Sequence, residues 1–161
     1  MNKKSLLKEV DGIYGKYRKI IWKEIPKKTK VTWKIKEIKF ESWDRGYWAA
    51  ENNKIFVGYD YKPKSKILTS IIHEAIHLNT INKKNQKRFS NSEKNAITRE
   101  IATCILTNFI IQKINKKLKK KFKKNRFDEW YKKYEGKSKE FEKLSEDKNF
   151  YEFFSIIKER I

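Results

Sequence analysis

The pattern His-Glu-x-x-His at residues 73–77 constrains this chain more than any other feature of its sequence. On a helix, His73 and His77 stand on one face, one turn apart, because they are four residues apart. Two imidazoles placed in this way can ligate one Zn²⁺ and leave room for a third protein ligand and a water. Glu74 lies about 100° around the helix from His73, within reach of that water as a general base. The pattern therefore predicts a zinc site with Glu74 as its catalytic residue.

The residues around the pattern are those of a buried helix. Glu74 is the single charged residue between Lys66 and Lys83. A carboxylate among apolar side chains costs desolvation free energy unless it has a function. The two histidines of the pattern are also the only two in the 161 residues. The alternative interpretation is a chance match, with satisfied core histidines or a degenerate, metal-free site.

Length and composition indicate a folded protein of one main domain. We expect a catalytic domain over residues 1–126 and a helical extension over 127–161 that packs on it. The single cysteine, Cys104, excludes an internal disulfide and suits a reducing compartment. The sequence shows neither a secretory signal nor an apolar stretch long enough to span a bilayer. We therefore expect a cytoplasmic protein without a membrane partner.

The net charge of +21 is partly concentrated in residues 112–127, which hold nine basic residues and no acidic one. Such an excess favours contact with nucleic acid or another polyanion. The basic residues of this run are Lys113, Lys116, Lys117, Lys119, Lys120, Lys121, Lys123, Lys124 and Arg126. The alternative is a solvated face, because lysine is abundant throughout the chain and phosphate-binding sites favour arginine. A second hypothesis is therefore a nucleic-acid-binding module whose metal site is structural, degenerate or absent.

Periodicity predicts an α+β fold. Apolar residues in steps of three and four indicate an amphipathic helix over residues 3–22, which Pro26 should end. Residues 31–40 alternate β-branched or aromatic residues with polar ones, as a half-buried strand does. Asn52-Asn53 between two further short strands predicts a hairpin, because asparagine tolerates positive φ. A small antiparallel sheet should therefore precede the helix with the histidines.

A second long helix should follow that helix. Ser90 and Glu93 have the spacing of a capping box, with Ser90 as N-cap. The apolar period that begins at Ile97 continues to about Lys124. Aromatic and aliphatic pairs after Asp128 predict short helices that pack back on the body.

The third metal ligand has to come from another part of the chain. Glu100 falls inside the second long helix between apolar residues, where it has no structural explanation, so it is the first candidate. Glu93 already has an explanation as part of the cap. Cys104 lies one turn beyond Glu100, although a lone buried cysteine is usually a small hydrophobic residue. A residue from Asp128 onward is a further alternative.

The motif at residues 73–77, together with Glu100 in the sequence Arg-Glu-Ile-Ala-Thr-Cys-Ile-Leu of residues 99–106, resembles the gluzincin type of zincin metallopeptidase. The order of elements is similar to the small minigluzincins and the ImmA/IrrE-like peptidases. The resemblance covers residues 1–110 and implies a minimal zincin-like fold of helix, small sheet, histidine helix and glutamate helix. It also implies a His73, His77 and Glu100 ligand set. SprT-like peptidases share this layout but use a third histidine, which the chain lacks.

The resemblance implies a protein or peptide substrate that is hydrolysed with Glu74 as the proton acceptor. The strand over residues 55–59, or its neighbour, could align the substrate by strand addition. A hydroxyl that stabilises the oxyanion is expected from Tyr47, Tyr59 or Tyr61. The sequence does not choose among the three, and the reading favoured for any one of them is a plain sheet or core aromatic.

Overall fold

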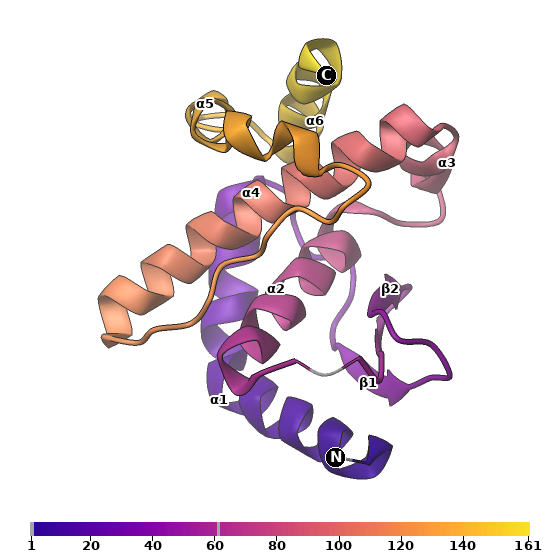
Figure 1. Cartoon of the computed structure of the whole chain (residues 1–161), viewed down its shortest axis with the longest axis vertical. Helices are drawn as coiled ribbons and strands as arrows, with labels where there is room; N and C mark the ends of the chain where they lie inside the picture. Colours follow the sequence, from indigo (N-terminus) through magenta and orange to yellow (C-terminus); the bar gives the residue numbers. More distant parts are fainter. Residues whose placement is uncertain (1, 61) are drawn as a thin grey trace.

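The computed structural model describes residues 2–60 and 62–161 of the chain. Within them it forms six α-helices, one 3-10 helix and a three-stranded sheet (Figure 1), which confirms the predicted α+β class. The elements are α1 (Lys3–Thr29), β1 (Lys39–Ser42), β2 (Ala49–Glu51), β3 (Lys54–Val57), α2 (Lys64–Thr80), α3 (Gln86–Ser90), α4 (Glu93–Leu118), η1 (Lys132–Lys137), α5 (Ser138–Leu144) and α6 (Phe150–Arg160).

Helix α2 lies at the centre of the molecule and contacts α1, α4 and the sheet (Figure 1). A helix with so many apolar residues is stable only when most of its faces are covered. Twelve of its residues are buried. One hydrophobic cluster joins the elements, from Val10 of α1 to Ile157 of α6. The helix that carries the histidines is therefore held by the core.

Helix α1 continues past Pro26 to Thr29, so the prediction that Pro26 ends it is wrong. A proline inside a helix removes the N–H that would bond to the carbonyl four residues earlier, here that of Trp22. The indole N–H of Trp33 donates to this carbonyl oxygen instead, at 3.0 Å. Because the freed carbonyl has a new partner, the helix tolerates the proline.

The sheet is mixed, so the prediction of an antiparallel sheet is wrong for one of its two strand pairs. Strands β2 and β3 form the expected antiparallel hairpin, with Asn52 at φ 60° in its turn. The strand order is β1-β3-β2, and β1 runs parallel to β3. The connection from β1 to β2 passes the end of β3, where a Cβ on Gly58 would lie 2.0 Å from the carbonyl oxygen of Gly46. This close approach requires glycine at position 58.

Residues 31–38 do not form the first part of the predicted strand, which begins at Lys39. In the parallel register Lys39 faces Lys54, the first residue of β3. Any earlier residue would have to pair with the hairpin turn, which offers no extended backbone. The side chains of residues 31–36 still alternate between half-buried and exposed, so the periodic pattern reflected burial correctly.

Helix α4 begins at Glu93 with Ser92 as its N-cap, so the predicted capping box of Ser90 and Glu93 is wrong. The hydroxyl of Ser92 accepts a hydrogen bond from a backbone N–H of the first turn. Ser90 ends the short helix α3 instead, where its hydroxyl donates to a carbonyl one turn earlier. Helix α4 also ends at Leu118, before the predicted end near Lys124.

The predicted short C-terminal helices are present as α5 and α6, after the 3-10 turn η1. Helix α6 packs on α4 and has four buried residues. These residues are Phe150, Phe153, Phe154 and Ile157. Phe154 also meets Phe89 of α3 edge to face, with ring centroids 4.9 Å apart. The division into a domain over 1–126 and an extension over 127–161 stays a prediction.

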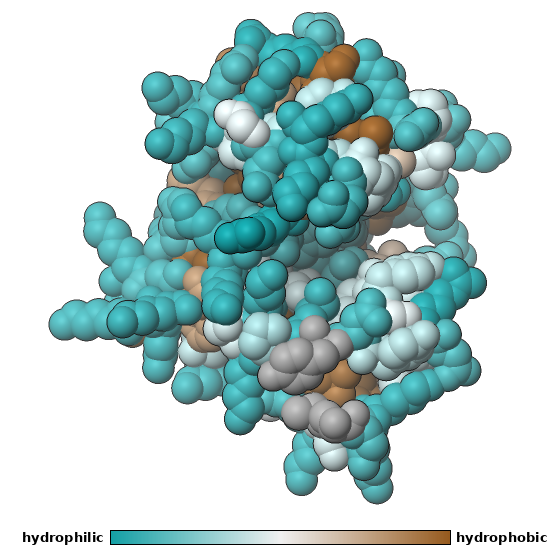
Figure 2. All heavy atoms as spheres, in the orientation of Figure 1, coloured by the Kyte–Doolittle hydropathy of each residue, from teal (hydrophilic) through white to brown (hydrophobic). Residues whose placement is uncertain are grey.

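Hydrophilic side chains cover most of the face seen in Figure 2, and hydrophobic residues show there in small areas. None of the helices in residues 2–60 and 62–161 is long and apolar enough to cross a membrane.

The bond from Trp33 to Trp22 predicts a coupling with Pro26. We expect Trp33→Phe to lower the free energy of unfolding by about 1–3 kcal/mol, because the Trp22 carbonyl then lacks a donor. In a Pro26→Ala background, the restored N–H of residue 26 can bond to that carbonyl, so the same change should cost less. Urea unfolding of the four proteins measures this coupling. An equal cost in both backgrounds would mean that the indole acts through packing alone.

Candidate metal centre

Helix α2 presents His73 and His77 from successive turns of one face. The other faces carry the apolar residues that pack into the core, so the histidine face is directed away from it. The two rings meet edge to face, with centroids 4.8 Å apart, and their Nε2 atoms are 3.2 Å apart. Each side chain is 12% exposed, so both rings are shielded and still accessible from one side.

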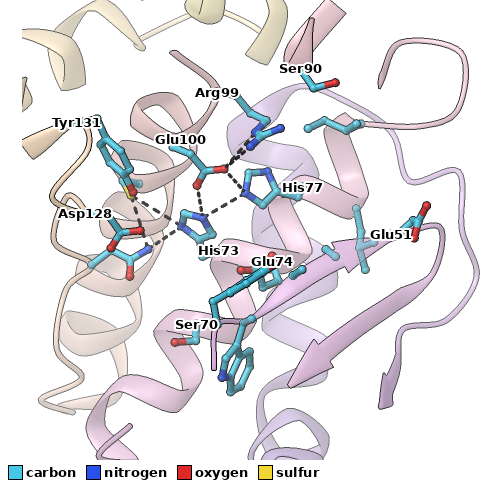
Figure 3. Close-up of a pocket in the computed structure, with 18 of the residues that line it drawn as sticks. Glu51, Ser70, His73, Glu74, His77, Ser90, Arg99, Glu100, Asp128 and Tyr131 are labelled. Carbon is cyan, nitrogen blue, oxygen red and sulfur yellow. Dashed lines mark hydrogen bonds and ion pairs between the residues drawn. The ribbon is translucent and has the colours of Figure 1, made fainter. Parts of the chain in front are cut away.

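Helix α4 brings Glu100 to the two histidines (Figure 3). Its Oε2 lies 3.0 Å from Nε2 of His73, and its Oε1 lies 3.3 Å from Nε2 of His77. The guanidinium of Arg99 donates to Oε1 of Glu100 at 3.0 Å and so restrains the carboxylate. Three residues that sequence reasoning placed at one site therefore converge, although 27 positions separate His73 from Glu100.

The group of His73, His77 and Glu100 could hold a metal ion. In a tetrahedral site with metal–ligand distances near 2.1 Å, the ligand atoms stand about 3.4 Å apart. The Nε2 atoms of the two histidines, 3.2 Å apart, come close to that value, and each of the three residues offers one ligand atom within 4.8 Å of the others. Imidazole nitrogens and a carboxylate are ligands of zinc and of other divalent first-row metals. Three protein ligands leave a fourth tetrahedral position for water.

The alternative third ligands lie outside this group. Glu93 is exposed at the start of α4. Cys104 is buried, but its sulfur lies 3.9 Å from Nδ1 of His73, the ring nitrogen that does not face Glu100. Asp128 lines the nearby cavity and is exposed, and it does not belong to the group either.

Ion pairing balances the charges at this group. Burial disfavours the charged form of His73, but Cys104 and Glu100 outweigh burial and raise the pKa of His73 well above its usual value. Burial also disfavours the ionised form of Glu100, and the two histidines outweigh it and hold the pKa of Glu100 well below its usual range. A metal ion must therefore compete with the proton of a histidinium–carboxylate pair.

Glu74 faces a cavity of about 670 Å³ beside the histidines (Figure 3). It is 8% exposed. Burial raises the pKa of Glu74, although positive charge on His73, His77 and Lys62 opposes this effect. A raised pKa brings a carboxylate nearer to the working range of a general base. One wall of the cavity comes from β2 and the loop before it, and the other comes from α4 and the segment after it.

Two side chains from the C-terminal half reach this site, and sequence reasoning missed both. The amide nitrogen of Asn125 lies 2.7 Å from Nδ1 of His73. Tyr131 is 1% exposed, its hydroxyl lies 3.6 Å from the sulfur of Cys104, and burial raises the pKa of its phenol. Both depend on how the chain returns along α4, for which the sequence carries no local signal.

Of the tyrosines predicted to stabilise an oxyanion, one lines the cavity, one does not, and one lies outside the described residues. Tyr47 lines the cavity and is 54% exposed. Tyr59 is 58% exposed and is not among the residues that line the cavity. Tyr61 lies outside the described residues. Tyr131 lines the wall on the side opposite the hairpin.

The basic run after residue 112 is exposed, with one exception. The ammonium of Lys113 lies 2.8 Å from Oε2 of Glu24, a residue that is 5% exposed. This bond raises the pKa of Lys113 and gives its charge a structural role. Within the described part of the chain, the other eight basic residues of the run are exposed and form no ion pair.

No protein-family model, curated protein or solved structure matches this chain. Its function therefore has to be inferred from the site.

The two glutamates of α4 should respond differently to metal. We expect zinc to raise the Tm of the wild type and of Glu93→Ala, because Glu93 lies outside the donor group. Glu100→Ala should lose most of this shift, since removing a ligand weakens binding by more than the ~10–100-fold typical of outer-shell changes. Thermal unfolding with zinc and with a chelator makes the comparison. A full zinc-dependent shift in Glu100→Ala would contradict the ligand assignment.

Proposed function

We propose that this chain is a zinc-dependent metallopeptidase, a zincin of the gluzincin type that hydrolyses peptide bonds. The observation that carries the proposal is the convergence of His73, His77 and Glu100 beside Glu74, at the edge of a cavity. A ligand set of two histidines and one glutamate, with an open fourth position, is typical of hydrolytic zinc sites. The resemblance of the motif and of the order of elements to zincins supports the same function.

The residues of the site have distinct roles in this proposal. His73, His77 and Glu100 would hold the ion, which when bound supplies a Lewis acid and lowers the pKa of a water. Glu74 accepts a proton from the attacking water and gives it to the leaving amine. Its low exposure limits the exchange of that proton with bulk solvent. Arg99 holds the carboxylate of Glu100 in place.

A peptide substrate fits the cavity because one of its walls is an edge strand. Strand β2 pairs with β3 on one side and, within the described residues, with no strand on the other. Residues 49–51 of β2 line the cavity. An extended peptide can add to such an edge through main-chain hydrogen bonds. Strand β3 is paired on both sides, so its neighbour β2 is the strand that would align the substrate.

Replacing the proposed general base tests the reaction. We expect Glu74→Gln to lower zinc-dependent peptide hydrolysis at least ~10²-fold, because the amide cannot accept the proton. Zinc content should stay at that of the wild type. Glu93→Gln, a change of an exposed carboxylate outside the cavity, is the matched control and should keep full activity. The measurement is cleavage of a mixed peptide library, with and without chelator.

Wild-type activity in Glu74→Gln would assign the general base to another residue. A zinc-loaded wild type that cleaves no member of the library would contradict the peptidase proposal, although the metal site would stand.

A second candidate function is binding to a polyanion such as nucleic acid. Eight basic residues of the run after residue 112 favour it, because they are exposed and form no ion pair with any residue that the structure describes. Such binding would be electrostatic and would weaken steeply with salt, because each neutralised phosphate releases counterions. It is compatible with peptidase activity on proteins bound to nucleic acid.

Charge reversal in the run tests this second function. We expect replacement of four lysines by glutamate to abolish DNA or RNA binding at low salt, measured by fluorescence anisotropy. The four positions are Lys116, Lys117, Lys119 and Lys120. The matched control reverses four exposed lysines of the C-terminal segment: Lys132, Lys133, Lys137 and Lys139. Equal loss in both variants would indicate a response to net charge alone, and no binding by the wild type would leave the run as a solvated face.

A further inference from the structure

The segment of residues 119–127, here called the strap, folds back along α4 (Figure 1), and its residue Asn125 contacts His73 of the candidate metal centre. The turn into it is made by Lys119, which has a left-handed φ of 51°. Two asparagines of α4 hold it. Asn115 bonds to both the N–H and the carbonyl of Phe122 at 2.9 Å, and Asn108 does the same to Asn125 at 2.7 and 3.0 Å.

The spacing of these contacts keeps the strap in register with the helix. Asn108 and Asn115 are seven residues apart, which is about 10.5 Å along a helix. Their partners Phe122 and Asn125 are three residues apart, which is about 10 Å along an extended chain. The strap is also bonded to α2, since the N–H of Lys123 donates to a carbonyl of its first turn at 2.9 Å. It is therefore fixed to both helices that supply the donor atoms.

The strap brings the side chain of Asn125 to the back of His73. The amide nitrogen is 2.7 Å from Nδ1 of His73, whereas Nε2 of the same ring faces His77 and Glu100. A neutral imidazole that ligates through Nε2 carries its proton on Nδ1 and needs an acceptor there. The oxygen and nitrogen of an asparagine amide are assigned from their partners and can exchange places by a flip. With the metal-binding tautomer, Asn125 therefore offers its oxygen to Nδ1–H.

The two histidines differ in the partner of their Nδ1 atoms. Within the described residues, Nδ1 of His77 is buried without a hydrogen-bond partner. The sulfur of Cys104 is near Nδ1 of His73 as well, but at 3.9 Å it is a weaker partner than the amide. Asn125 is thus the group best placed to select the tautomer of one ligand.

We propose that Asn125 is a positioning residue of the metal centre: its side-chain oxygen accepts a hydrogen bond from Nδ1–H of His73, fixes the tautomer and ring orientation, and so strengthens metal binding through Nε2. Asn108 supports this contact by holding the backbone of Asn125. The inference rests on the zinc site of the proposed function. Outer-shell partners of this kind typically contribute about 10–100-fold to metal affinity.

Two substitutions at position 125 distinguish a role of the amide oxygen, as acceptor, from a role of the amide nitrogen, as donor. Asn125→Ala removes both and should weaken zinc and cobalt binding about 10–100-fold. It should also alter the visible absorption spectrum of the bound cobalt. Asn125→Asp keeps an acceptor oxygen and removes the donor, so it should restore affinity to within about 3-fold of the wild type. Affinities come from competition of each protein with a chromophoric chelator at constant pH.

Asn115→Ala is the matched control, because it removes a pair of bonds to the backbone of Phe122 equivalent to the pair that Asn108 makes to Asn125, and it leaves the contact of Asn125 with His73 in place. It should lower the Tm of the metal-free protein and leave metal affinity within about 3-fold of the wild type.

Three results would overturn the inference: wild-type affinity in Asn125→Ala, affinity in Asn125→Asp as weak as in Asn125→Ala, or an equal loss in Asn115→Ala. In the second case the amide donor makes the contact, and in the third the strap acts only as a tether. A wild-type protein that binds neither metal would contradict the proposed zinc site itself, and this result is distinct from the other three.

Discussion

The packing of α4 against α2 is the interaction on which the rest of the structure depends. It places one carboxylate, from Glu100, against two imidazoles in a setting that is mostly shielded from water. Burying any one of these polar groups alone would cost desolvation free energy. The cost is offset here because each group has another of the three as its hydrogen-bond or ion-pair partner. The neighbouring parts support this contact: Arg99 holds the carboxylate, and the strap reaches the far side of His73.

The same arrangement lets His73 and Glu100 share a proton in the absence of metal and exchange it for a metal ion. Without metal, the pair of His73 and Glu100 holds a proton strongly, as the opposite pKa directions of the two groups indicate. In the proposed zinc site, the same three residues would become ligands and the proton would leave. Glu74 is not part of that group of three, and its carboxylate lines the cavity beside it. Helix α2 thus carries both the two histidines and Glu74, and its 3.6-residue repeat directs the histidines to Glu100 and Glu74 to a different part of the cavity wall.

The parts that sequence reasoning predicted correctly are those with a local cause. His73 and His77 share a face because of their spacing, and Glu100 was selected because a lone carboxylate in an apolar helix lacks a structural role. The errors have tertiary causes. Pro26 does not end α1 because a tryptophan eleven residues beyond Trp22 replaces the lost donor. The strand predicted before Lys39 does not form because its neighbour β3 begins only after the hairpin turn, and the periodicity of one segment carries no information about its partner.

The residues that were missed, Asn125 and Tyr131, lie in segments that carry no recognisable motif. Their places at the site are decided by the turn after α4 and by the asparagine contacts that hold the strap. Asn108 and Asn115 are seven residues apart on one helix face, and this spacing was visible in the sequence. The spacing does not by itself predict that the two asparagines hold the strap, because the position of the strap depends on long-range contacts. The same contacts explain why the second part of the basic run, residues 119–127, lies back along α4 and does not continue the helix.

We propose that His73, His77 and Glu100, and no sulfur, are the protein ligands of zinc. X-ray absorption at the zinc edge of the zinc-loaded protein tests it most directly. We expect about one zinc per chain, with a first shell of nitrogen and oxygen at about 2.0–2.2 Å that includes the imidazole signature of two histidines. A sulfur shell at about 2.3 Å would assign Cys104 as a ligand and contradict the account. A protein that retains no zinc after loading would contradict it as well.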